Sequence, residues 1–383
     1  MTVKSCPICN SVSLFTFFSR DNVPTNENLI FENYDDALNI TRGNLTSTIC
    51  KVCDFVFNQS FDFSLMNYGS NYENSQNSSV FFQNHISNLI NDLIVKSQIR
   101  NSKILEIGCG NGYFLKQLVK NDSWKNFGIG YDPSYIESKK NSQNIRFEKS
   151  FFDDSCKEDS DLIISRHVIE HIPEPIPFLK SIRKISKPQT KIFFETPTIE
   201  WILKNHVFWD FTYEHCSFFT KNSLTTAFQI AGFKVKSVKS VFNNQYLWLE
   251  AVPSISQNIT TNPSLQKHAK VFQSFVKNKE EKLKSKFKKL MKNGNIALWG
   301  AAGKGVCMAN TIDPKHEFIE CLIDLNPKKW GKFIPGTGHE IINSTEIEKR
   351  KIKTAIVMNP NYYNEIKKLI KEQNLDIILI NSE

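Results

Sequence analysis

One stretch of the chain, residues 102–119, indicates the fold; it reads SKILEIGCGNGYFLKQLV. It begins with a short apolar run, passes through a glycine-rich turn and ends with apolar residues at helical spacing. A strand, a glycine-rich turn and a helix in this order form the first unit of a Rossmann-like sheet. Gly108, Gly110 and Gly112 lack a Cβ, so the backbone of this turn can approach a bound ligand closely.

Two acidic residues near this turn indicate the kind of ligand. Glu106 stands at the end of the strand, directly before the glycines, and suits an ammonium group better than a pyrophosphate. Asp132 ends a second strand 22 residues after Gly110, where a carboxylate can accept hydrogen bonds from both ribose hydroxyls. This pair resembles the class I S-adenosylmethionine (SAM) methyltransferases, which implies that Glu106, Gly108, Gly110 and Asp132 bind SAM. A dinucleotide remains the alternative ligand.

A phenylalanine pair and a histidine-containing loop follow these strands. The superfamily usually contacts adenine at the position of Phe151 and Phe152, so the resemblance implies that Phe152 binds the cofactor. His167 follows the fourth strand, and we expect it to line the cofactor pocket. His171, in the same loop, either caps the loop or takes a direct part in catalysis.

The composition is that of a globular protein. The chain has 383 residues, of which 40% are hydrophobic and 23% charged, as expected for two or three domains. No apolar run approaches the roughly 20 residues that span a bilayer, and the first residues, MTVKSCPICN, contain no secretory signal. We therefore expect a cytoplasmic protein with no membrane partner, in which the nine cysteines do not form disulfides.

Four cysteines form two closely spaced pairs near the N-terminus. Cys6 and Cys9 make one C-x-x-C knuckle, and Cys50 and Cys53 make a second. Two such knuckles can surround one ion with four thiolates, the usual geometry of structural zinc. We therefore predict a zinc-binding domain over residues 1–66; four free or buried cysteines are the alternative.

A second α/β unit is expected in the last third of the chain. Residues 295–310, NIALWGAAGKGVCMAN, again suggest a strand, a glycine-rich turn and a helix. The turn, with Lys304, suits a phosphate, although a plain tight turn explains it equally well. We predict a SAM-binding methyltransferase domain over residues 67–255 and a Rossmann-like substrate domain over residues 256–383.

The net charge of +9 is concentrated just before this unit. Residues 267–292 hold ten Lys and two Glu, which gives this stretch a local charge of +8. Apolar residues in it recur near helical spacing, so we interpret the run as the solvated face of an amphipathic helix. A polar linker at residues 61–79 carries Tyr68 and Tyr72, which either belong to a loop or bind the substrate.

The order of these features resembles the three-domain NDP-sugar C-methyltransferases. The shared features are the paired cysteines, the SAM turn, the segment EHCSFF at residues 214–219, the turn GAAGKG and the later D-x-N-P-x-K…P-G-T pattern. The resemblance covers essentially the full chain. It implies methyl transfer from SAM to C3 of a nucleotide-linked 4-keto-deoxysugar, with zinc as a structural metal.

The resemblance also implies catalytic roles. His215 would remove the C3 proton as the base, Glu214 would orient its ring, and a tyrosine hydroxyl would stabilise the charge on the C4 oxygen. The family pattern runs Tyr-His-Glu-His, whereas this chain has Thr212-Tyr213-Glu214-His215. Tyr213 is the nearest candidate for the tyrosine, but a shift by one residue in an extended segment points the side chain to the other face. Tyr68 or Tyr72 would then replace it.

Two other functions compete with this interpretation. A methyltransferase acting on oxygen or nitrogen of a small molecule would use the same cofactor site, with His215 deprotonating a hydroxyl. A zinc-containing nucleic-acid-binding protein would use the cysteine pairs and the Lys-rich helix, but it leaves both α/β domains unexplained. We therefore expect a small-molecule substrate and no nucleic acid.

Overall fold

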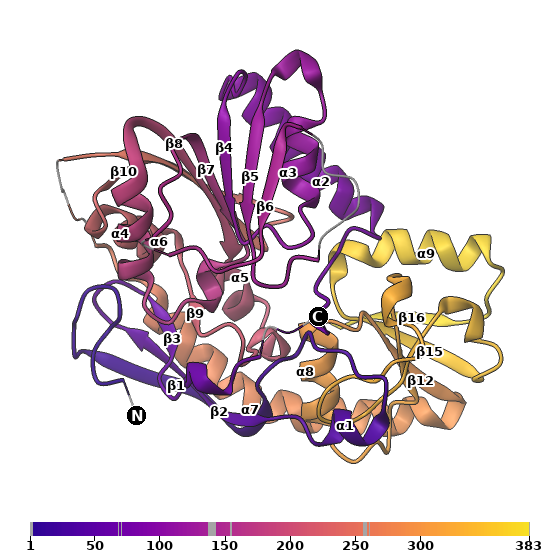
Figure 1. Ribbon diagram of the computed structural model, residues 1–383. Coiled ribbons are helices and arrows are strands. Elements are labelled where there is room, and N and C mark those ends of the chain that lie inside the picture. The colour runs from indigo at the N-terminus through magenta and orange to yellow at the C-terminus, as the bar shows by residue number, and fades with distance from the viewer. Residues whose placement is uncertain are drawn as a thin grey trace.

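Three β-sheets, with helices packed around them, make up the described part of the protein (Figure 1). The computed structural model describes residues 3–67, 69, 71–136, 143–153, 155–255, 259 and 261–382. In sequence order the sheets are an N-terminal antiparallel sheet, a mixed middle sheet and a parallel C-terminal sheet. The predicted α/β class is confirmed, with a Rossmann-like sheet in both the middle and the last part of the chain.

The N-terminal sheet carries the two cysteine pairs and takes one strand from far along the chain. Its strand order is β1-β2-β3-β9, with β1 (Leu14–Pro24), β2 (Arg42–Cys50), β3 (Val56–Asn58) and β9 (Ser217–Phe218). Val56 pairs with Phe218, and Phe57 pairs with Ser217. The strand β9 lies inside the predicted middle domain, so a division of the chain at residue 66 cuts across this sheet.

The middle sheet has seven strands in the order β10-β11-β8-β7-β4-β5-β6. Five of them, from β8 to β6, are parallel, and β11 joins β8 antiparallel. The strands are β4 (Lys103–Ile107), β5 (Phe127–Tyr131), β6 (Ile145–Glu148), β7 (Ser160–Arg166), β8 (Ser186–Pro197), β10 (Phe233–Val241) and β11 (Tyr246–Pro253). The strand order reverses between β4 and β7, where this class of sheet binds its ligands.

Helices cover both faces of the middle sheet, because each helix presents one apolar stripe to it. The helices α2 (Val80–Asn91) and α3 (Tyr113–Val119) pack on one face, and α4 (Pro175–Ile185) and α6 (Lys221–Ile230) pack on the other. The predicted glycine turn lies between β4 and α3, and Gly112 caps α3 in a left-handed conformation that favours glycine. The short helix α5 (Ile199–Lys204) follows β8.

The C-terminal sheet is fully parallel, with the order β14-β13-β12-β15-β16. Its strands are β12 (Asn295–Trp299), β13 (Cys321–Ile323), β14 (Ile341–Ile342), β15 (Ile352–Val357) and β16 (Ile378–Asn381), and its helices are α8 (Gly303–Ile312) and α9 (Tyr363–Glu372). Here the order reverses between β12 and β15. The short helix α1 (Tyr34–Leu38) reaches this domain from the N-terminal part, since Gly336 N–H donates to the Ala37 carbonyl at 2.8 Å.

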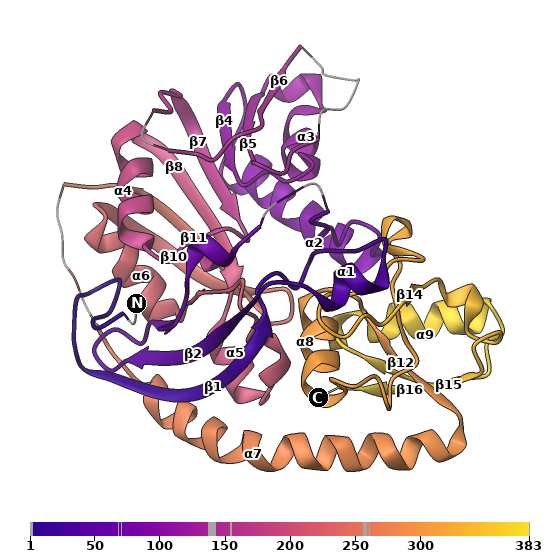
Figure 2. The same cartoon turned by 60° about the horizontal axis from the view of Figure 1, so that its bottom comes forward.

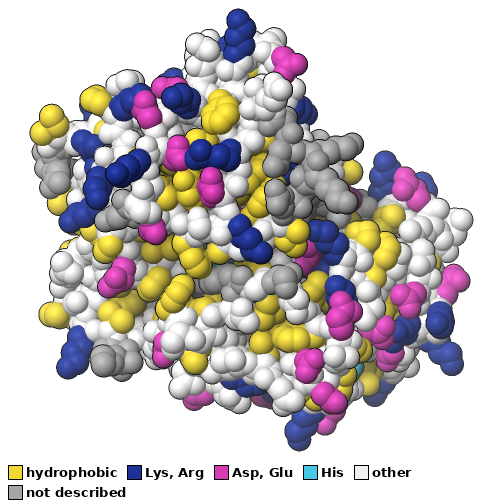
Figure 3. All heavy atoms as spheres, in the orientation of Figure 1, with side chains coloured by type: hydrophobic (Ala, Val, Ile, Leu, Met, Phe, Trp, Pro, Cys, Tyr) yellow, Lys and Arg dark blue, Asp and Glu magenta, His cyan; other side chains and the backbone are white. Residues whose placement is uncertain are grey.

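The long helix α7 (Leu265–Leu290) runs beneath the N-terminal and C-terminal sheets (Figure 2). Phe272, Val276 and Phe287 are buried against these sheets, while Phe275 stays exposed. The Lys-rich stretch is thus an amphipathic helix, as predicted. On the face shown in Figure 3, basic and acidic side chains are interspersed over the C-terminal domain. No described helix is both long and apolar enough to cross a membrane.

Candidate active site

A cavity of about 230 Å³ lies between the middle and C-terminal sheets. One wall includes His167, Glu170 and His171, which follow β7. The opposite wall includes Trp299 at the end of β12 and Asn359 after β15. Both walls stand at the carboxyl end of a strand beside a reversal of strand order, which is where open α/β sheets bind ligands. A ligand in this cavity contacts both domains.

The segment that contains the Glu-His pair forms part of the cavity wall. Thr212 and His215 line the cavity, and the segment is attached to the N-terminal sheet directly afterwards, where β9 pairs with β3. The backbone N–H of Asn58 also donates to the carbonyl of Cys216 at 2.9 Å. The position of His215 therefore depends on the sheet that carries the cysteine pairs.

His215 lies in an environment that favours its neutral form. Burial lowers the pKa of its imidazole, because a charged ring is poorly solvated there. The positive charges of His167 and Lys304 lower this pKa further, and together these effects outweigh the carboxylates of Glu170 and Asp210. A neutral imidazole can accept a proton, so His215 is suited to act as a base near neutral pH.

His171 is the nearest aromatic neighbour of this imidazole in the cavity wall. The centroids of the His171 and His215 rings are 4.9 Å apart. Glu170, His171 and His215 also bring one potential metal ligand each within 4.8 Å of one another. The Glu170 carboxylate is already bonded to Thr196 at 3.0 Å and to the His167 ring at 3.3 Å. The Glu170 carboxylate therefore already has hydrogen-bond partners within the protein.

Glu214 is hydrogen-bonded to a tyrosine and to the backbone of the N-terminal part. The Tyr72 hydroxyl donates to Glu214 Oε2 at 2.6 Å, and the Asn28 N–H donates to Oε1 at 2.8 Å. Tyr72 lines the cavity, so this carboxylate positions a hydroxyl group there. Within the described part of the chain, the Glu214 carboxylate is hydrogen-bonded to Asn28 and Tyr72, and its role in orienting the His215 ring stays a prediction. Tyr68, the other tyrosine expected to bind substrate, lies outside the described residues.

Tyr213 faces away from the cavity, in contrast to the catalytic role expected for it. Its side chain is buried, its ring packs beside Phe61 at 5.2 Å between centroids, and its hydroxyl accepts the Asp62 N–H at 2.9 Å. Thr212 lines the cavity in place of Tyr213, and the backbone bends at Tyr213 and Glu214 before β9 begins.

A buried carboxyl group that the sequence did not reveal supports this segment. Glu27 accepts the Tyr213 N–H on Oε1 at 2.6 Å and the Glu214 N–H on Oε2 at 3.4 Å. Burial raises the pKa of Glu27 well above its usual value, and the charge of Glu214 raises it further. Glu27 therefore fixes the backbone before His215. Its position, 186 residues earlier in the chain, gives no sequence signal of this contact.

His167 belongs to a buried network of charges. Burial alone would lower its pKa, but its contacts with Glu170 and Glu195 outweigh burial and raise the pKa to about 9. Glu195 also accepts from Arg166 Nε at 2.8 Å and contacts His85 Nε2 at 2.6 Å. His167 thus presents a positive charge to the interdomain cavity, and its contact with the cofactor stays a prediction.

The turn after β4 fits a positively charged ligand such as SAM. Glu106 is buried, and its Oε2 has no hydrogen-bond partner among the described residues. Burial raises the pKa of this carboxyl to about 8, so a ligand's ammonium group beside it would favour its ionised form. At Gly110, φ is +53°, and a Cβ would meet no atom within 4 Å, which leaves space at the turn.

Asp132 stands beside this turn, as ribose binding requires. Its Oδ2 accepts the Gly110 N–H at 2.7 Å, and its Oδ1 accepts the Ser134 N–H at 2.8 Å. A Cβ at Gly108 would lie 2.1 Å from the Val168 side chain, so this position of the turn has room only for glycine. Phe152 packs edge-on against Tyr131, with 6.1 Å between the ring centroids.

Comparison with known families agrees with this geometry. Residues 82–238 match the family described as a methyltransferase domain, and residues 258–376 match the C-methyltransferase C-terminal domain. This chain pairs a methyltransferase domain with a C-methyltransferase C-terminal domain. The two matches cover most strands of the middle and C-terminal sheets and support a SAM-dependent methyltransferase with the class I Rossmann-like fold.

The curated relatives of this chain are distant. The C-methyltransferase NovU of Streptomyces niveus is 23% identical over 191 residues, which cover 46% of this chain and 46% of NovU. A ubiquinone biosynthesis O-methyltransferase of Coxiella burnetii is 26% identical over 121 residues, or 29% of this chain and 51% of the relative. The chain spans about half the length of these relatives.

Solved structures are more distant still. The magnesium protoporphyrin IX methyltransferase of Synechocystis PCC 6803, with bound S-adenosylhomocysteine, is 14% identical and has a TM-score of 0.37. The matched part covers 46% of this chain and 84% of that one. A score this low does not support a comparison of site geometry.

Lys304 links the C-terminal domain to the methyltransferase domain. It stands in the first turn of α8 and forms an ion pair with Asp210, and its Nζ lies 4.9 Å from the centroid of the Trp201 ring. Both members of the ion pair line the cavity. The phosphate contact expected for Lys304 would have to compete with Asp210.

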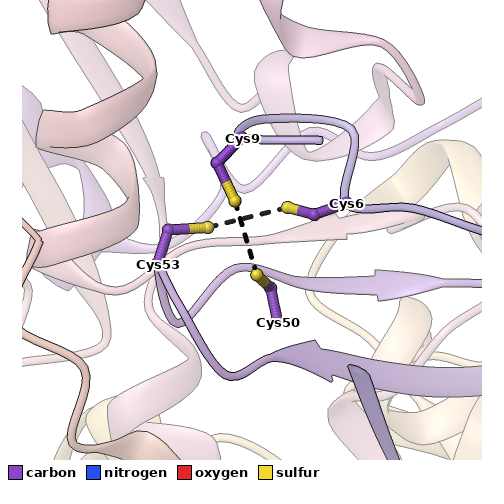
Figure 4. A group of neighbouring side chains, drawn as sticks. All are labelled: Cys6, Cys9, Cys50 and Cys53. Atoms are coloured by element: carbon purple, nitrogen blue, oxygen red, sulfur yellow. Dashed lines mark hydrogen bonds between the residues drawn. The ribbon is translucent and has the colours of Figure 1, made fainter. Parts of the chain in front are cut away.

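The four N-terminal cysteines converge on one point (Figure 4). The Sγ atoms of Cys6 and Cys53 are 3.6 Å apart, those of Cys9 and Cys50 are 3.5 Å apart, and all four lie within 4.8 Å of one another. These distances are too long for disulfides. A zinc ion with Zn–S bonds of about 2.3 Å would place its tetrahedral sulfurs about 3.8 Å apart, so the cluster fits this metal.

Proposed function

We propose that this chain transfers a methyl group from SAM to C3 of a nucleotide-linked 4-keto-deoxysugar, with His215 as the base. The observation that carries the proposal is the position of a neutral-favouring imidazole in a cavity between a methyltransferase domain and a C-methyltransferase C-terminal domain. Methylation of carbon requires a base because a C–H group, unlike an amine, is not nucleophilic.

Each residue of the site has a separate role in the proposed reaction. His215 takes the proton from the carbon beside the ketone, which leaves an enolate on the substrate. The Tyr72 hydroxyl, which donates to Glu214 in this structure, would have to exchange this acceptor for the ketone oxygen in order to stabilise the charge that develops there. Glu106 and Asp132 would hold the ammonium and ribose groups of SAM, which supplies an electrophilic methyl group. The enolate carbon bonds to this methyl as the carbon–sulfur bond breaks.

The test is the variant His215→Asn, compared with His171→Asn as a control on the neighbouring ring. Methyl transfer to a 4-keto sugar nucleotide should fall by about 10²–10⁴-fold in His215→Asn, the usual contribution of a positioned base. Exchange of the substrate's C–H with deuterium, measured without SAM, should fall in parallel. SAM binding and melting temperature should stay close to those of the unmodified protein, and His171→Asn should retain exchange.

The same measurement separates the proposal from transfer to oxygen. The similarity to an O-methyltransferase favours this second candidate. An enzyme that methylates a hydroxyl needs no exchange at carbon, so methyl transfer without deuterium exchange would replace C-methylation by O-methylation. Full exchange in a folded His215→Asn variant would exclude His215 as the base.

We also propose that the four cysteines hold one structural zinc ion. All four positions around the metal would be sulfur, which leaves none for catalysis. The knuckle of Cys50 and Cys53 leads directly into β3, which pairs with β9 beside His215. Metal analysis should find one zinc per chain, and its removal by a chelator should abolish methyl transfer by displacing the catalytic segment. Unchanged activity in metal-free protein would contradict this link.

A further inference from the structure

Four buried polar atoms of cavity-lining residues have no hydrogen-bond partner among the described residues. One of them, His167 Nε2, lies 3.4 Å from the Glu195 carboxylate, and the other three have no ion pair within the described chain either. These three are Thr212 Oγ1, Gln245 Oε1 and Trp299 Nε1, and each of these residues is 3% exposed. Unpaired buried polar atoms are rare in folded proteins because each one costs about as much free energy as a lost hydrogen bond. The three residues line one cavity, so a ligand bound there is a source of the missing partners.

The orientation of the Gln245 amide is set by its neighbours. The backbone N–H of Asn361 donates to Asn359 Oδ1 at 3.1 Å, which identifies that atom as an acceptor. Gln245 Nε2 donates to the same oxygen at 3.0 Å. The free atom of Gln245 is therefore its carbonyl oxygen, so the ligand must present a hydrogen-bond donor to it.

Trp299 Nε1 and Thr212 Oγ1 require different hydrogen-bond partners. The indole nitrogen of Trp299 only donates, so the ligand must present an acceptor to it, whereas the hydroxyl of Thr212 can donate or accept. Hydroxyl groups satisfy all three positions, because each hydroxyl both donates and accepts.

The positive charges nearby are already compensated, and that of His167 is paired with Glu170 at 3.3 Å and Glu195 at 3.4 Å. Lys304 is paired with Asp210, and the buried Lys329 donates to the Ala301 carbonyl at 2.8 Å and lies 3.6 Å from Asp324. These lysines and both carboxylates line the same cavity. The part of the ligand that meets the three free atoms therefore has no need of a negative charge.

We propose that Thr212, Gln245 and Trp299 together bind the neutral, hydroxyl-bearing ring of the substrate and set its specificity. The inference rests on the proposed function, because that function supplies a nucleotide-linked sugar as the ligand. Trp299 comes from the C-terminal domain and the other two residues come from the methyltransferase domain. The set is complete only when the two domains are joined as in this structure.

The test uses variants that remove one polar atom and keep the shape: Thr212→Val, Gln245→Met and Trp299→Phe. Binding of thymidine diphosphate glucose is measured by calorimetry on the full chain without SAM, and thymidine diphosphate serves as the probe without a hexose. Each variant should weaken binding of the sugar nucleotide by about tenfold, since a hydrogen bond contributes about that factor. Binding of thymidine diphosphate should be unchanged.

Two control variants change residues outside the cavity wall, and one of them repeats the replacement of an indole by a phenyl ring. Trp209 Nε1 is also buried without a partner, but Trp209 does not line the cavity, so Trp209→Phe should bind both probes as the unmodified protein does. Asn243 lies in the same turn as Gln245 and donates across the domain interface to Asn361 Oδ1 at 2.8 Å. Its φ of +54° suits glycine, and Asn243→Gly should leave the affinity for the hexose unchanged.

A structural role would give a different pattern. Replacing an unpaired buried polar atom by an apolar group should not lower the melting temperature. Thr212→Ser, which keeps the hydroxyl, should bind thymidine diphosphate glucose like the unmodified protein. The inference is overturned if the three variants bind this probe normally, if both probes weaken equally, or if the unmodified protein binds the two probes equally well.

Activity measurements distinguish a failure of the proposed function from a failure of the inference about hexose binding. Loss of proton exchange and methyl transfer with a 4-keto sugar nucleotide, while the three variants still bind the glucose probe weakly, would refute the proposed function and retain the inference. Normal methyl transfer with normal hexose binding in all three variants would retain the proposed function and refute the inference.

Discussion

The two glycine-rich turns, at residues 108–112 and 300–305, have the same local construction. Each follows a short buried strand and leads into a helix, β4 to α3 in one case and β12 to α8 in the other. Asp132 accepts the Gly110 N–H at 2.7 Å, and Asp324 accepts the Ala301 N–H at 2.9 Å. In both domains an acid at the end of the second strand therefore supports the turn.

The difference between the turns is the charge left without a partner. The residue before the last in β4 is Glu106, a buried acid with an unpaired oxygen, whereas the corresponding residue of β12 is Leu298. The second turn is instead occupied by the chain's own cation, since Lys329 Nζ donates to the Ala301 carbonyl. The same turn can thus serve a cationic ligand or be neutralised internally, and only the surrounding side chains decide which.

The strongest test of this contrast is Glu106→Gln. The amide keeps an acceptor of similar size but cannot pair with an ammonium group, so SAM affinity should fall by about 10–100-fold, as for loss of a charge-assisted hydrogen bond. Calorimetric titration with SAM measures the effect. Unchanged affinity with one bound SAM would remove Glu106 from the cofactor site and weaken the contrast between the turns.

The paired variants Asp132→Asn and Asp324→Asn sharpen the contrast by making one change in both turns. Asp132→Asn should lower SAM affinity by about 1–2 kcal/mol, because the amide accepts fewer hydrogen bonds from the ribose. Asp324→Asn should leave SAM affinity unchanged and lower the melting temperature, because Lys329 loses its counter-charge. A loss of SAM binding in Asp324→Asn would place cofactor chemistry in the second turn as well.

A further test of the contrast is the pH dependence of SAM binding. Burial raises the pKa of Glu106 to about 8, so below this pH the carboxyl must release a proton when an ammonium group binds beside it. SAM affinity should therefore rise by up to about tenfold per pH unit and level off above about pH 8. Titrations in two buffers of different ionisation enthalpy would detect the released proton, and Glu106→Gln should lose this component.

The same group gives a stability effect of defined sign. An acid whose pKa is higher in the folded than in the unfolded protein keeps its proton in the folded state, so it lowers stability as the pH rises from 4.5 toward about 8. Without SAM, the melting temperature of the unmodified protein should fall over this range more than that of Glu106→Gln. Equal slopes would contradict the pKa assigned to Glu106.

Features of the active site that depend on nearby residues were predictable from the sequence. The turn at Gly108–Gly112 needs only a strand, glycines and a helix in succession, and the knuckles of Cys6–Cys9 and Cys50–Cys53 need only a fixed spacing. Local backbone geometry dictates these features, so their residue pattern is sufficient evidence.

Features that join distant parts of the chain were not predictable. The Asn28 N–H reaches Glu214 across 186 residues, and β9 joins β3 from 160 residues away, so no local pattern records either contact. The direction of Tyr213 was undecided for a related reason, since its hydroxyl is held by Asp62 and not by a neighbour in sequence.

The sequence by itself determined the two Rossmann-like units, the cysteine pairs and the identity of the Glu-His pair, because helix and strand periodicity and short spacings are local properties. Only the tertiary structure decided that Thr212 rather than Tyr213 faces the cavity, that Glu27 supports the segment before His215, and that Gln245 and Trp299 keep unpaired atoms there. These outcomes depend on which hydrogen bonds the packed domains satisfy, and those partners are fixed only when the sheets meet.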